Sequence, residues 1–557
     1  MIRKEKSKEW ILIFIMAVTI AVVTGFPYLN RGITGHLGDM LYHMQRIESV
    51  KAALLSGQYP ARVNPSFFYG YGYGSSLFYP DVFLLVPALL RILGISPLVT
   101  WKLFVVMIAF VGSVMTYFSL HSICRSRIYA MAGTFLLMLS QFYLADVIDR
   151  AGLSEYIACM FFPVLAAGIF DFFAGEGRKT YLIGIAFVGM LLSHTIMTVV
   201  GLVFTVLVFL SMLAFRSKRK VFLDKARMRR LIVTAVLSVL AVSYYIFPML
   251  EQIMNDRFWF QEPWANIGDF TQPVSAFFQP TGYFEYIAYV GVGIPILILL
   301  PGRVLMRKPQ EKWADYFLGA GIGLLMGMTN LLPWKLLTHT FFNMLQFTYR
   351  FYPVALCCIC VGLSLYLKEK CQENARSVVL FIAAVSVLSG IWQNVAVTSD
   401  TDRWAVDEEL VRTGTIYVGQ AEWLPEKVQW EVRAGEREYI VLGSDERLEL
   451  ISEGYNRNYF IKEKEAADRY LLPLVYYKGY SAKLICGDGT AITLETSQSE
   501  EGLVQIDVGE GMRGTVRVAY TGTTVQLLSN LVSAVTLAGI LLYGPVRKIR
   551  KKRLTFE

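Results

Sequence analysis

Three side chains near the start of the chain have types and a spacing that could do chemistry. Asp39, His43 and Arg46 occupy positions i, i+4 and i+7, which places them on one face of a helix. A carboxylate at that place can act as a general base, and a neighbouring cation can hold its ionisation state or bind phosphate. A second interpretation stays open, because an Asp at the beginning of a helix is also a common N-cap.

A second polar group surrounds Arg150, in the stretch from Asp146 to Glu155. Charges gathered between two apolar segments are costly unless they are paired or solvated. One interpretation is an internal ion pair between Asp149 and Arg150. The other is a shared site, in which Arg150 and Glu155 complete a polar cluster with Asp39.

Three further polar side chains interrupt apolar segments. His194 lies at a break in the apolar stretch 181–215, where a single His is more often a helix-end residue than a ligand. Gln346 and Arg350 lie one helical turn apart at the end of another apolar segment. An Arg at that depth costs about 2–3 kcal/mol on insertion scales, so it usually has an anionic partner. A phosphate suits it, because a guanidinium group can bind two phosphoryl oxygens at once.

The elements that must position these residues are transmembrane helices. Of the 557 residues, 55% are hydrophobic and only 17% are charged, whereas a soluble chain carries about 25% charged residues. The excess apolar residues fall in blocks of about 20, the length that crosses a bilayer core. This composition predicts a polytopic α-helical membrane protein and excludes a soluble enzyme, a disulfide-stabilised secreted protein and a disordered chain. The sequence also lacks a Walker A motif, a dinucleotide-binding glycine motif and a catalytic Ser motif.

The distribution of charge orients these helices. Residues 397–525 contain 23 acidic and 14 basic side chains, a net of −9, and the rest of the chain carries +18. Basic residues gather in cytoplasmic loops because such loops resist translocation. The net charge of +9 is therefore a topology signal and does not indicate a nucleic-acid partner. Placing each basic cluster inside gives about 12 spans with both termini in the cytoplasm, at roughly 10–29, 98–121, 128–144, 156–174, 180–193, 195–215, 231–250, 281–300, 313–332, 345–367, 377–396 and 526–545.

This topology divides the chain into three parts. We predict a transmembrane domain over residues 1–396 with a large first external loop at 30–96, an extracytoplasmic β-rich domain over 397–525, and a final span with a basic cytoplasmic tail over 526–557. Alternating residues in 513–520 and the turn signal Gly487-Asp488-Gly489 predict strands in the second part. The apolar stretch Val82–Leu93 is too short to cross upright, and the sequence leaves open whether it crosses the membrane or re-enters it.

With these segments in order, the chain resembles the GT-C superfamily of integral-membrane glycosyltransferases. The stretch Leu472–Lys483, the turn at Gly487 and the strand 514–520 resemble the β-sandwich of bacterial membrane proteins of the YfhO type. Four other segments resemble the same proteins and relatives labelled 6-pyruvoyl-tetrahydropterin synthase related. They are Asp39–Pro60, Arg150–Glu155, Ser193-His194 and Gln346–Arg350.

The resemblance implies an activity and a location. The implied activity is transfer of a sugar, with inversion, from a polyprenyl-phosphate carrier to a cell-envelope glycan or glycolipid on the outer face of the bacterial cytoplasmic membrane. Asp39 matches the acidic residue of the family's first loop and is implied as the base, with Glu155 assisting. The residues implied to contact lipid phosphate or acceptor are His43, Arg46, Arg150, His194, Gln346 and Arg350.

The resemblance leaves the cofactors open. The first loop has no Asp-x-Asp pair, so a divalent cation is neither required nor excluded, and no set of metal ligands is predicted. The chain also lacks the zinc-binding His cluster from which a soluble pterin synthase builds its site, so the family label does not predict pterin chemistry.

Two functions of other classes stay open. A transporter or flippase for lipid-linked envelope precursors would place charges deep in several spans and repeat its two halves, and the sequence shows neither clearly. A non-enzymatic envelope scaffold would use the β-rich domain as a binding module. Tyr476, Tyr477 and Tyr480 could then stack on a glycan, although packing inside the domain is the commoner role for such tyrosines.

Overall fold

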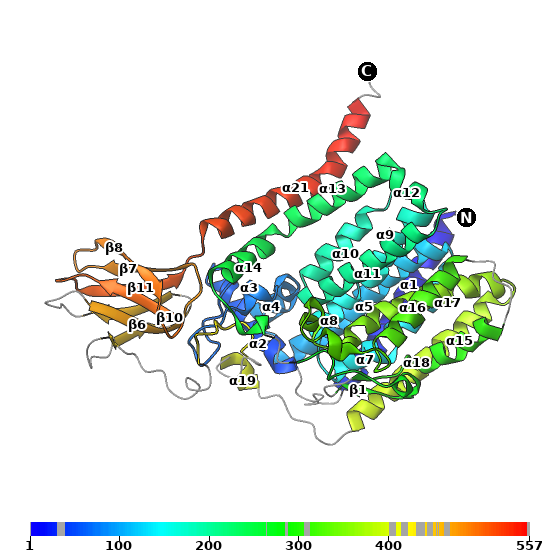
Figure 1. Cartoon of the computed structure of the whole chain (residues 1–557), viewed down its shortest axis with the longest axis horizontal. Coiled ribbons are helices and arrows are strands. Elements are labelled where there is room, and N and C mark those ends of the chain that lie inside the picture. The colour runs from blue at the N-terminus through cyan, green and yellow to red at the C-terminus, as the bar shows by residue number, and fades with distance from the viewer. Residues whose placement is uncertain are drawn as a thin grey trace. The chain divides into compact units, whose positions relative to one another are not determined.

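The structure is a computed structural model, and its fold divides into two compact units (Figure 1). One unit comprises Met1–Met44, Gly94–Ser238 and Ala265–Glu408, and the other comprises Gln45–Leu93, Val239–Trp264 and Glu409–Glu557. The predicted division into domains at 396 and 525 stays a prediction. The structure describes residues 2–29, 39–262, 265–284, 288–305, 312–399, 408–413, 421–429, 441–442, 449–452, 454, 456–461 and 468–553.

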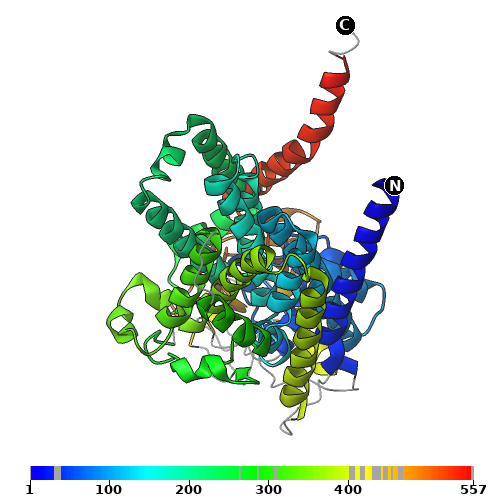
Figure 2. The same cartoon turned by 90° about the vertical axis from the view of Figure 1, so that its right-hand side faces the viewer.

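The first unit is a bundle of helices (Figure 2). In it α1 (Ile2–Gly25) packs against α5 (Pro97–Cys124), and α16 (Lys312–Gly327) packs against α17 (Tyr352–Lys370). A short hairpin, β1 (Tyr283–Phe284) with β2 (Ala288–Tyr289), joins the bundle. The other helices of this unit are α6 (Arg127–Met138), α7 (Gln141–Ile148), α8 (Leu153–Cys159), α9 (Phe162–Ala174), α10 (Tyr181–Leu191), α11 (Thr195–Ala214), α12 (Arg219–Leu223), most of α13 (Lys225–Ala241), α15 (Ile294–Leu305) and α18 (Ala375–Ser399).

The length and composition of these helices confirm a polytopic membrane protein. Among the described residues, seven helices are long and apolar enough to cross a membrane, and two bent helix pairs raise the number to nine. The predicted number of 12 spans stays a prediction, because the expected spans near 180–193, 281–300 and 313–332 correspond to shorter helices. The seven helices are Ser7–Tyr28, Pro97–Cys124, Leu153–Ala174, Thr195–Ala214, Thr348–Lys370, Ala375–Thr398 and Thr524–Tyr543.

Breaks in the helices create helix ends inside the bundle, and polar side chains lie at these ends. The pair α6 and α7 bends by 47° around Ser140. Three residues, ending with His194, separate the end of α10 from the start of α11. Pro163 occupies the first turn of α9, where the missing N–H of proline costs no helical hydrogen bond. The first four N–H groups of each helix need partners from outside the helix, and these breaks therefore attract polar residues.

The second unit takes helices from the first loop, from the segment 239–264 and from the end of the chain. In this unit α14 (Ser243–Asn255) packs against α21 (Thr524–Arg553) and against the short helix α3 (Ser75–Phe78). The stretch Val82–Ile92, which contains α4 (Leu85–Ile92), is a short apolar helix, and whether it crosses or re-enters the membrane stays open.

Two antiparallel sheets in the second unit form a β-sandwich, as predicted (Figure 1). One sheet has the order β3 (Val441–Leu442), β6 (Asp468–Val475), β10 (Leu503–Val508), β9 (Thr496–Gln498). The other has the order β4 (Glu449–Ser452), β5 (Asn456–Ile461), β11 (Gly514–Tyr520), β7 (Tyr480–Ile485), β8 (Ala491–Leu494). One buried cluster takes side chains from both sheets, among them Leu472 and Val504 from the first and Leu484 and Val516 from the second. The predicted turn at Gly489 joins β7 to β8 with a positive φ of 86°, which glycine adopts without strain.

The helix predicted after Asp39 is present as α2 (Met40–Leu55), but its surroundings differ from the expectation. Sequence periodicity predicted an amphipathic helix lying against the membrane surface. Its apolar stripe is instead covered by protein, because Met40, Met44, Ile47 and Val50 are each no more than 2% exposed. The apolar face therefore packs in a core, and lipid does not reach it.

Of the three tyrosines considered for glycan stacking, Tyr477 has the packing role. Tyr477 is 1% exposed, and its hydroxyl donates a hydrogen bond to the backbone oxygen of Trp423 at 2.9 Å. Its ring stacks on Phe258 with 6.2 Å between centroids. Tyr477 therefore packs inside the unit and is not available for stacking on a glycan.

Candidate functional site

The site begins at the start of α2, where Asp39 is tied to Arg150 through the backbone. The Asp39 N–H donates to the Arg150 carbonyl at 3.1 Å, and the Asp39 carbonyl accepts from the His43 N–H at 3.0 Å, as the first hydrogen bond of the helix. The Asp39 carboxylate lies 3.8 Å from the Arg150 guanidinium, and 47% of its side-chain surface is exposed. Asp39 therefore begins the helix and also presents a carboxylate at the surface of the cluster.

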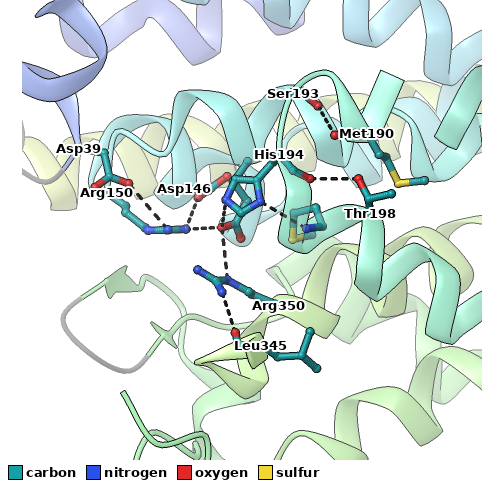
Figure 3. A network of polar contacts seen from close by, with 11 residues as sticks. Asp39, Asp146, Arg150, Met190, Ser193, His194, Thr198, Leu345 and Arg350 are labelled. Carbon is teal, nitrogen blue, oxygen red and sulfur yellow. Dashed lines mark hydrogen bonds and ion pairs between the residues drawn. The ribbon is translucent and has the colours of Figure 1, made fainter. Parts of the chain in front are cut away.

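A tight turn between α7 and α8 directs Arg150 inward (Figure 3). The Arg150 N–H donates to the Ala145 carbonyl, and the Gly152 N–H donates to the Asp146 carbonyl at 2.8 Å. The Arg150 side chain then donates to Glu155 Oε2 at 2.7 Å and to Asp146 Oδ1 at 3.2 Å. Arg150 thus pairs with acidic side chains on both flanking helices, Asp146 on α7 and Glu155 on α8.

Glu155 lies at the centre of the cluster. Its side chain is 1% exposed, and its Oε2 lies 2.7 Å from Arg150 Nη1, 3.8 Å from His194 Nε2 and 3.9 Å from Arg350 Nε. The other carboxylate oxygen, Oε1, is buried without a hydrogen-bond partner. A buried carboxylate with one unsatisfied oxygen is costly, so Glu155 holds an acceptor that a bound group could use.

His194 is both a helix end and a member of the cluster. It precedes α11, and its Nδ1 accepts the backbone N–H of Met197 at 3.3 Å. An imidazole whose Nδ1 accepts a hydrogen bond carries its proton on Nε2, the atom that faces Glu155 (Figure 3). The common helix-end role and the site role of this His therefore coincide.

Arg350 approaches Glu155 from the start of the helix that contains α17. Its Nη1 donates to the Leu345 carbonyl at 2.6 Å, and the residue is 4% exposed. The spacing predicted that Gln346 and Arg350 share one face of a helix, and this prediction is wrong. The backbone of Gln346 has a φ of 60°, and two 3-10 turns, Phe341–Leu345 and Thr348–Phe351, replace the expected helix there.

Two predicted site residues, His43 and Arg46, follow Asp39 along α2. Arg46 belongs to the second unit and donates to Asp81 Oδ1 at 2.6 Å and to the carbonyl of Pro80 at 2.8 Å. His43 is 1% exposed within α2. The contacts described above bring together Asp39, Arg150, Glu155, His194 and Arg350 from the predicted set, and His43 joins them through its backbone hydrogen bond to Asp39.

Two residues of the cluster were not predicted as site residues. Asp146 is fully buried and shares Arg150 with Glu155. Its i, i+4 spacing to Arg150 was the signal that could have identified it. At Gly152, an added Cβ would lie 2.6 Å from Asp146 Oδ1, so the turn needs a glycine at this position. Nothing in the sequence near Gly152 indicated that close approach.

The charges of the cluster act on the one accessible carboxylate. Burial raises the pKa of Asp39 above its ordinary value, Arg150 and Arg350 lower it, and Glu155 raises it. Burial alone would lower the pKa of Arg150, but Glu155, Tyr349 and Asp39 raise it well above its usual value. Arg150 therefore stays a cation, and Asp39 is a carboxylate with a higher proton affinity than usual, as a general base requires.

The side chains of the cluster decide which ligands it can bind. Within the part of the chain that the structure describes, no three His, Cys, Asp or Glu side chains are grouped so as to hold a metal ion. The cluster presents the half-exposed carboxylate of Asp39 beside a partly exposed Arg150. The buried Arg350 and Glu155 complete it. Such a set can accept a proton at Asp39 and bind an anionic oxygen at the guanidinium groups.

Comparison with known proteins confirms the predicted family. A family model described as a 6-pyruvoyl-tetrahydropterin synthase related domain of membrane proteins matches residues 77–398, more than half of the chain. An uncharacterized protein of Lactococcus lactis subsp. cremoris (strain MG1363) is 22% identical over 337 residues, which are 58% of this chain and 54% of that protein. The chain thus spans about half the length of this relative.

Two groups of solved structures are similar over part of their length. The mycobacterial arabinofuranosyltransferase AftD has a TM-score of 0.40 and 14% identity, covering 70% of this chain and 27% of AftD. The Archaeoglobus fulgidus oligosaccharyltransferase in complex with Zn and sulfate also has a TM-score of 0.40 and 14% identity, covering 71% of this chain and 54% of that enzyme.

Proposed function

We propose that this chain, which belongs to the family of membrane proteins described as 6-pyruvoyl-tetrahydropterin synthase related, is a glycosyltransferase. It would move a sugar from a polyprenyl-phosphate carrier to a cell-envelope glycan or glycolipid on the outer face of the cytoplasmic membrane. The observation that carries the proposal is the half-exposed carboxylate of Asp39, joined through the partly exposed Arg150 to a network that also contains a second arginine, two buried acids and one His. The sequence resemblance to GT-C glycosyltransferases supports the same reaction.

In the proposed step, the acceptor hydroxyl lies against Asp39. The acceptor oxygen forms a bond to the anomeric carbon of the sugar, its proton passes to the Asp39 carboxylate, and the bond from that carbon to the phosphate oxygen breaks. Polyprenyl phosphate leaves with the electron pair, and the configuration at the anomeric carbon inverts. A positioned base typically contributes about 10²–10⁴-fold to such a rate.

The two arginines are suited to the leaving phosphate. Arg150 and Arg350 both approach Glu155 Oε2, at 2.7 and 3.9 Å, so a phosphate would have to share them with this carboxylate. The looser contact, from Arg350, is the easier one to exchange. Because negative charge grows on the phosphate as the glycosidic bond breaks, a guanidinium that binds it more tightly in the transition state accelerates the reaction.

The test measures transfer of labelled sugar from polyprenyl-phosphate donors in membranes that contain the full chain. Asp39→Asn should reduce transfer by about 10²–10⁴-fold, while thermal stability stays close to that of the wild type. Asp269→Asn is a matched control, because Asp269 is an exposed acid of the same unit. Repeating the assay with EDTA and with added Mg²⁺ decides whether a divalent cation takes part.

Two outcomes would contradict the proposal. Unchanged transfer by Asp39→Asn removes the assignment of the base. Movement of labelled carrier lipid across proteoliposomes without any covalent product favours a flippase. The donor and acceptor classes are found by comparing glycolipids and wall polymers from cells with and without the protein.

A further inference from the structure

Arg62, in the second unit, is a buried cation that hydrogen-bonds only to neutral oxygens. The residue is 7% exposed. Its Nη2 donates to the Tyr244 carbonyl at 2.8 Å and to Asn530 Oδ1 at 3.0 Å. Among the residues that the structure describes, Arg62 forms no ion pair. Burial lowers the pKa of Arg62, and the cost of burying a cation is normally offset by an anion beside it.

The charges of the surrounding stretch, residues 45–93, leave Arg62 without an acid of its own. The stretch contains four basic residues and two acids. Both acids pair with the other three cations, in the pairs Arg46–Asp81, Arg91–Glu48 and Lys51–Glu48. Because this stretch belongs to the loop predicted on the outer side, its excess positive charge has no role in the positive-inside rule. Arg62 is therefore the cation of this loop that can serve an external anion.

The acceptors of the Arg62 guanidinium place it at the edge of a transmembrane helix. Asn530 lies six residues after the first residue of α21, about 9 Å along the helix axis. On one side of Asn530 the neighbouring Ser533 is buried, whereas on the other side Leu527 and Leu531 are 69% and 59% exposed. The guanidinium thus lies beside the surface that α21 presents to lipid, where a cation usually has an anionic partner.

Hydrogen bonds between α14 and α21 hold these acceptors in place. The Ser533 hydroxyl lies 3.0 Å from the Ser243 hydroxyl and accepts the Tyr244 N–H at 2.8 Å. The guanidinium carbon of Arg62 lies 5.9 Å from the centroid of the Tyr244 ring. Within the described part of the chain, neither Nε nor Nη1 of Arg62 donates a hydrogen bond. Both can donate to phosphate oxygens while Nη2 stays anchored to the helices.

We propose that Arg62 binds the phosphate of an anionic membrane lipid at the lipid-facing edge of α21. The acyl chains lie in the bilayer against the exposed leucines of this helix, so the site needs no internal cavity. A lipid phosphate fits better than a soluble anion, because the acceptors of the guanidinium belong to transmembrane helices and exposed apolar side chains flank them. The site uses residues of the second unit alone and does not depend on the proposed sugar transfer.

The experiment places the full chain in nanodiscs of phosphatidylcholine, with or without phosphatidylglycerol. The readouts are the Tm and the number of phosphatidylglycerol molecules retained in native mass spectrometry. Phosphatidylglycerol should raise the Tm of the wild type, and one molecule should remain bound.

The decisive variant gives Arg62 an internal anion of the same shape as its present partner. Asn530→Asp puts a carboxylate where the amide oxygen lies 3.0 Å from Nη2. This variant should keep the Tm of the wild type in phosphatidylcholine, and it should lose the bound phosphatidylglycerol and most of the Tm shift. Asn255→Asp is the matched control, because it makes the same change at an exposed position of α14, and it should keep both.

A second variant removes the cation itself. Arg62→Gln should also lose the bound lipid and the Tm shift, whereas Arg517→Gln, at an exposed position of β11, should keep them. If Arg62→Gln is destabilised in phosphatidylcholine, the result for Asn530→Asp decides. Four results would overturn the proposal: no shift in the wild type, retention of lipid and shift in Asn530→Asp, equal loss in Asn530→Asp and Asn255→Asp, or an equal shift produced by inorganic phosphate in phosphatidylcholine nanodiscs.

Discussion

Two arginines, one in each unit, show how the same side chain can stabilise a fold or take part in a site. Arg46 takes its partners from one short stretch, the carbonyls of Tyr79 and Pro80 and the carboxylate of Asp81, and its side chain is fully buried. Arg150 takes its partners from separate parts of the chain, and one of them, Asp39, is 47% exposed. The first arrangement closes a loop onto a helix.

The second arrangement stays open to a ligand. Around Arg150, Glu155 retains a buried oxygen without a partner, and Arg350 and His194 approach the same carboxylate at 3.9 and 3.8 Å. Distances of this kind are longer than hydrogen bonds, so the groups can reorganise when a ligand arrives. Asp81 Oδ2 is likewise buried without a hydrogen-bond partner, so an unsatisfied oxygen does not separate the two arginines. The exposed end of the Arg150 network does, because a ligand can reach it, and an accessible charge network of this kind is typical of a functional site.

The largest expected effect comes from removing each arginine. Arg150→Met and Arg46→Met should both destabilise the protein by about 3–5 kcal/mol, because each leaves buried carboxylate charge without its partner. Only Arg150→Met should also abolish sugar transfer per folded molecule. Thermal unfolding and transfer assays on the folded fraction measure the two effects. Equal loss of transfer in both variants would remove the distinction between the arginines.

The acids that pair with these arginines should differ in what their substitution changes, which is transfer for one and thermal stability for the other. Asp39→Asn should reduce transfer by about 10²–10⁴-fold with little change in Tm, since its carboxylate is half exposed. Asp81→Asn should lower the Tm, because Asp81 is buried against Arg46, and should leave transfer per folded molecule unchanged. A drop in transfer with Asp81→Asn would indicate that the Arg46 pair also supports the site.

Much of the site could be predicted from sequence because charges are scarce in an apolar chain. Each of Asp39, Arg150, Glu155 and Arg350 stands out beside an apolar segment, and the positive-inside rule placed them on one side of the membrane. Strands were predictable from the alternation in 513–520 and the glycine turn before it, which the structure forms as β11 and the β7–β8 connection. The sandwich itself was predicted from the family resemblance.

The remaining features depend on tertiary packing. The pairing of Arg46 with Asp81 joins residues 35 positions apart through a loop, and helical spacing contains no signal for it. Gln346 adopts a positive φ, which its residue type does not predict, so the prediction of a shared helical face was wrong. The apolar stripe of α2 looked the same whether protein or lipid covered it, since periodicity reports a buried face but not what buries it.

Two glycines offer a smaller and more selective test of the same comparison. A Cβ on Gly152 would lie 2.6 Å from Asp146 Oδ1, and a Cβ on Gly74 would lie 2.5 Å from the Tyr477 ring. Both alanine variants should destabilise the protein by about 1–3 kcal/mol, but only Gly152→Ala should reduce transfer, by displacing Asp146 from Arg150. Gly319→Ala is the control, because its Cβ meets open space in α16.

The smallest expected effect is a displacement of the pH dependence of transfer. If Asp39 must be ionised, transfer is lost as the pH falls through the pKa of Asp39, and burial raises that pKa above the ordinary value. Glu155 also raises it, so Glu155→Gln should move the acidic limb of kcat/KM to lower pH, even though the variant is slower overall. Glu48→Gln removes a partly buried acid that pairs with Arg91 in the second unit and should leave the limb in place. A limb that moves to higher pH in Glu155→Gln would mean that Asp39 is not the group whose ionisation limits transfer. Loss of a neighbouring negative charge can only lower the pKa of a carboxylate base.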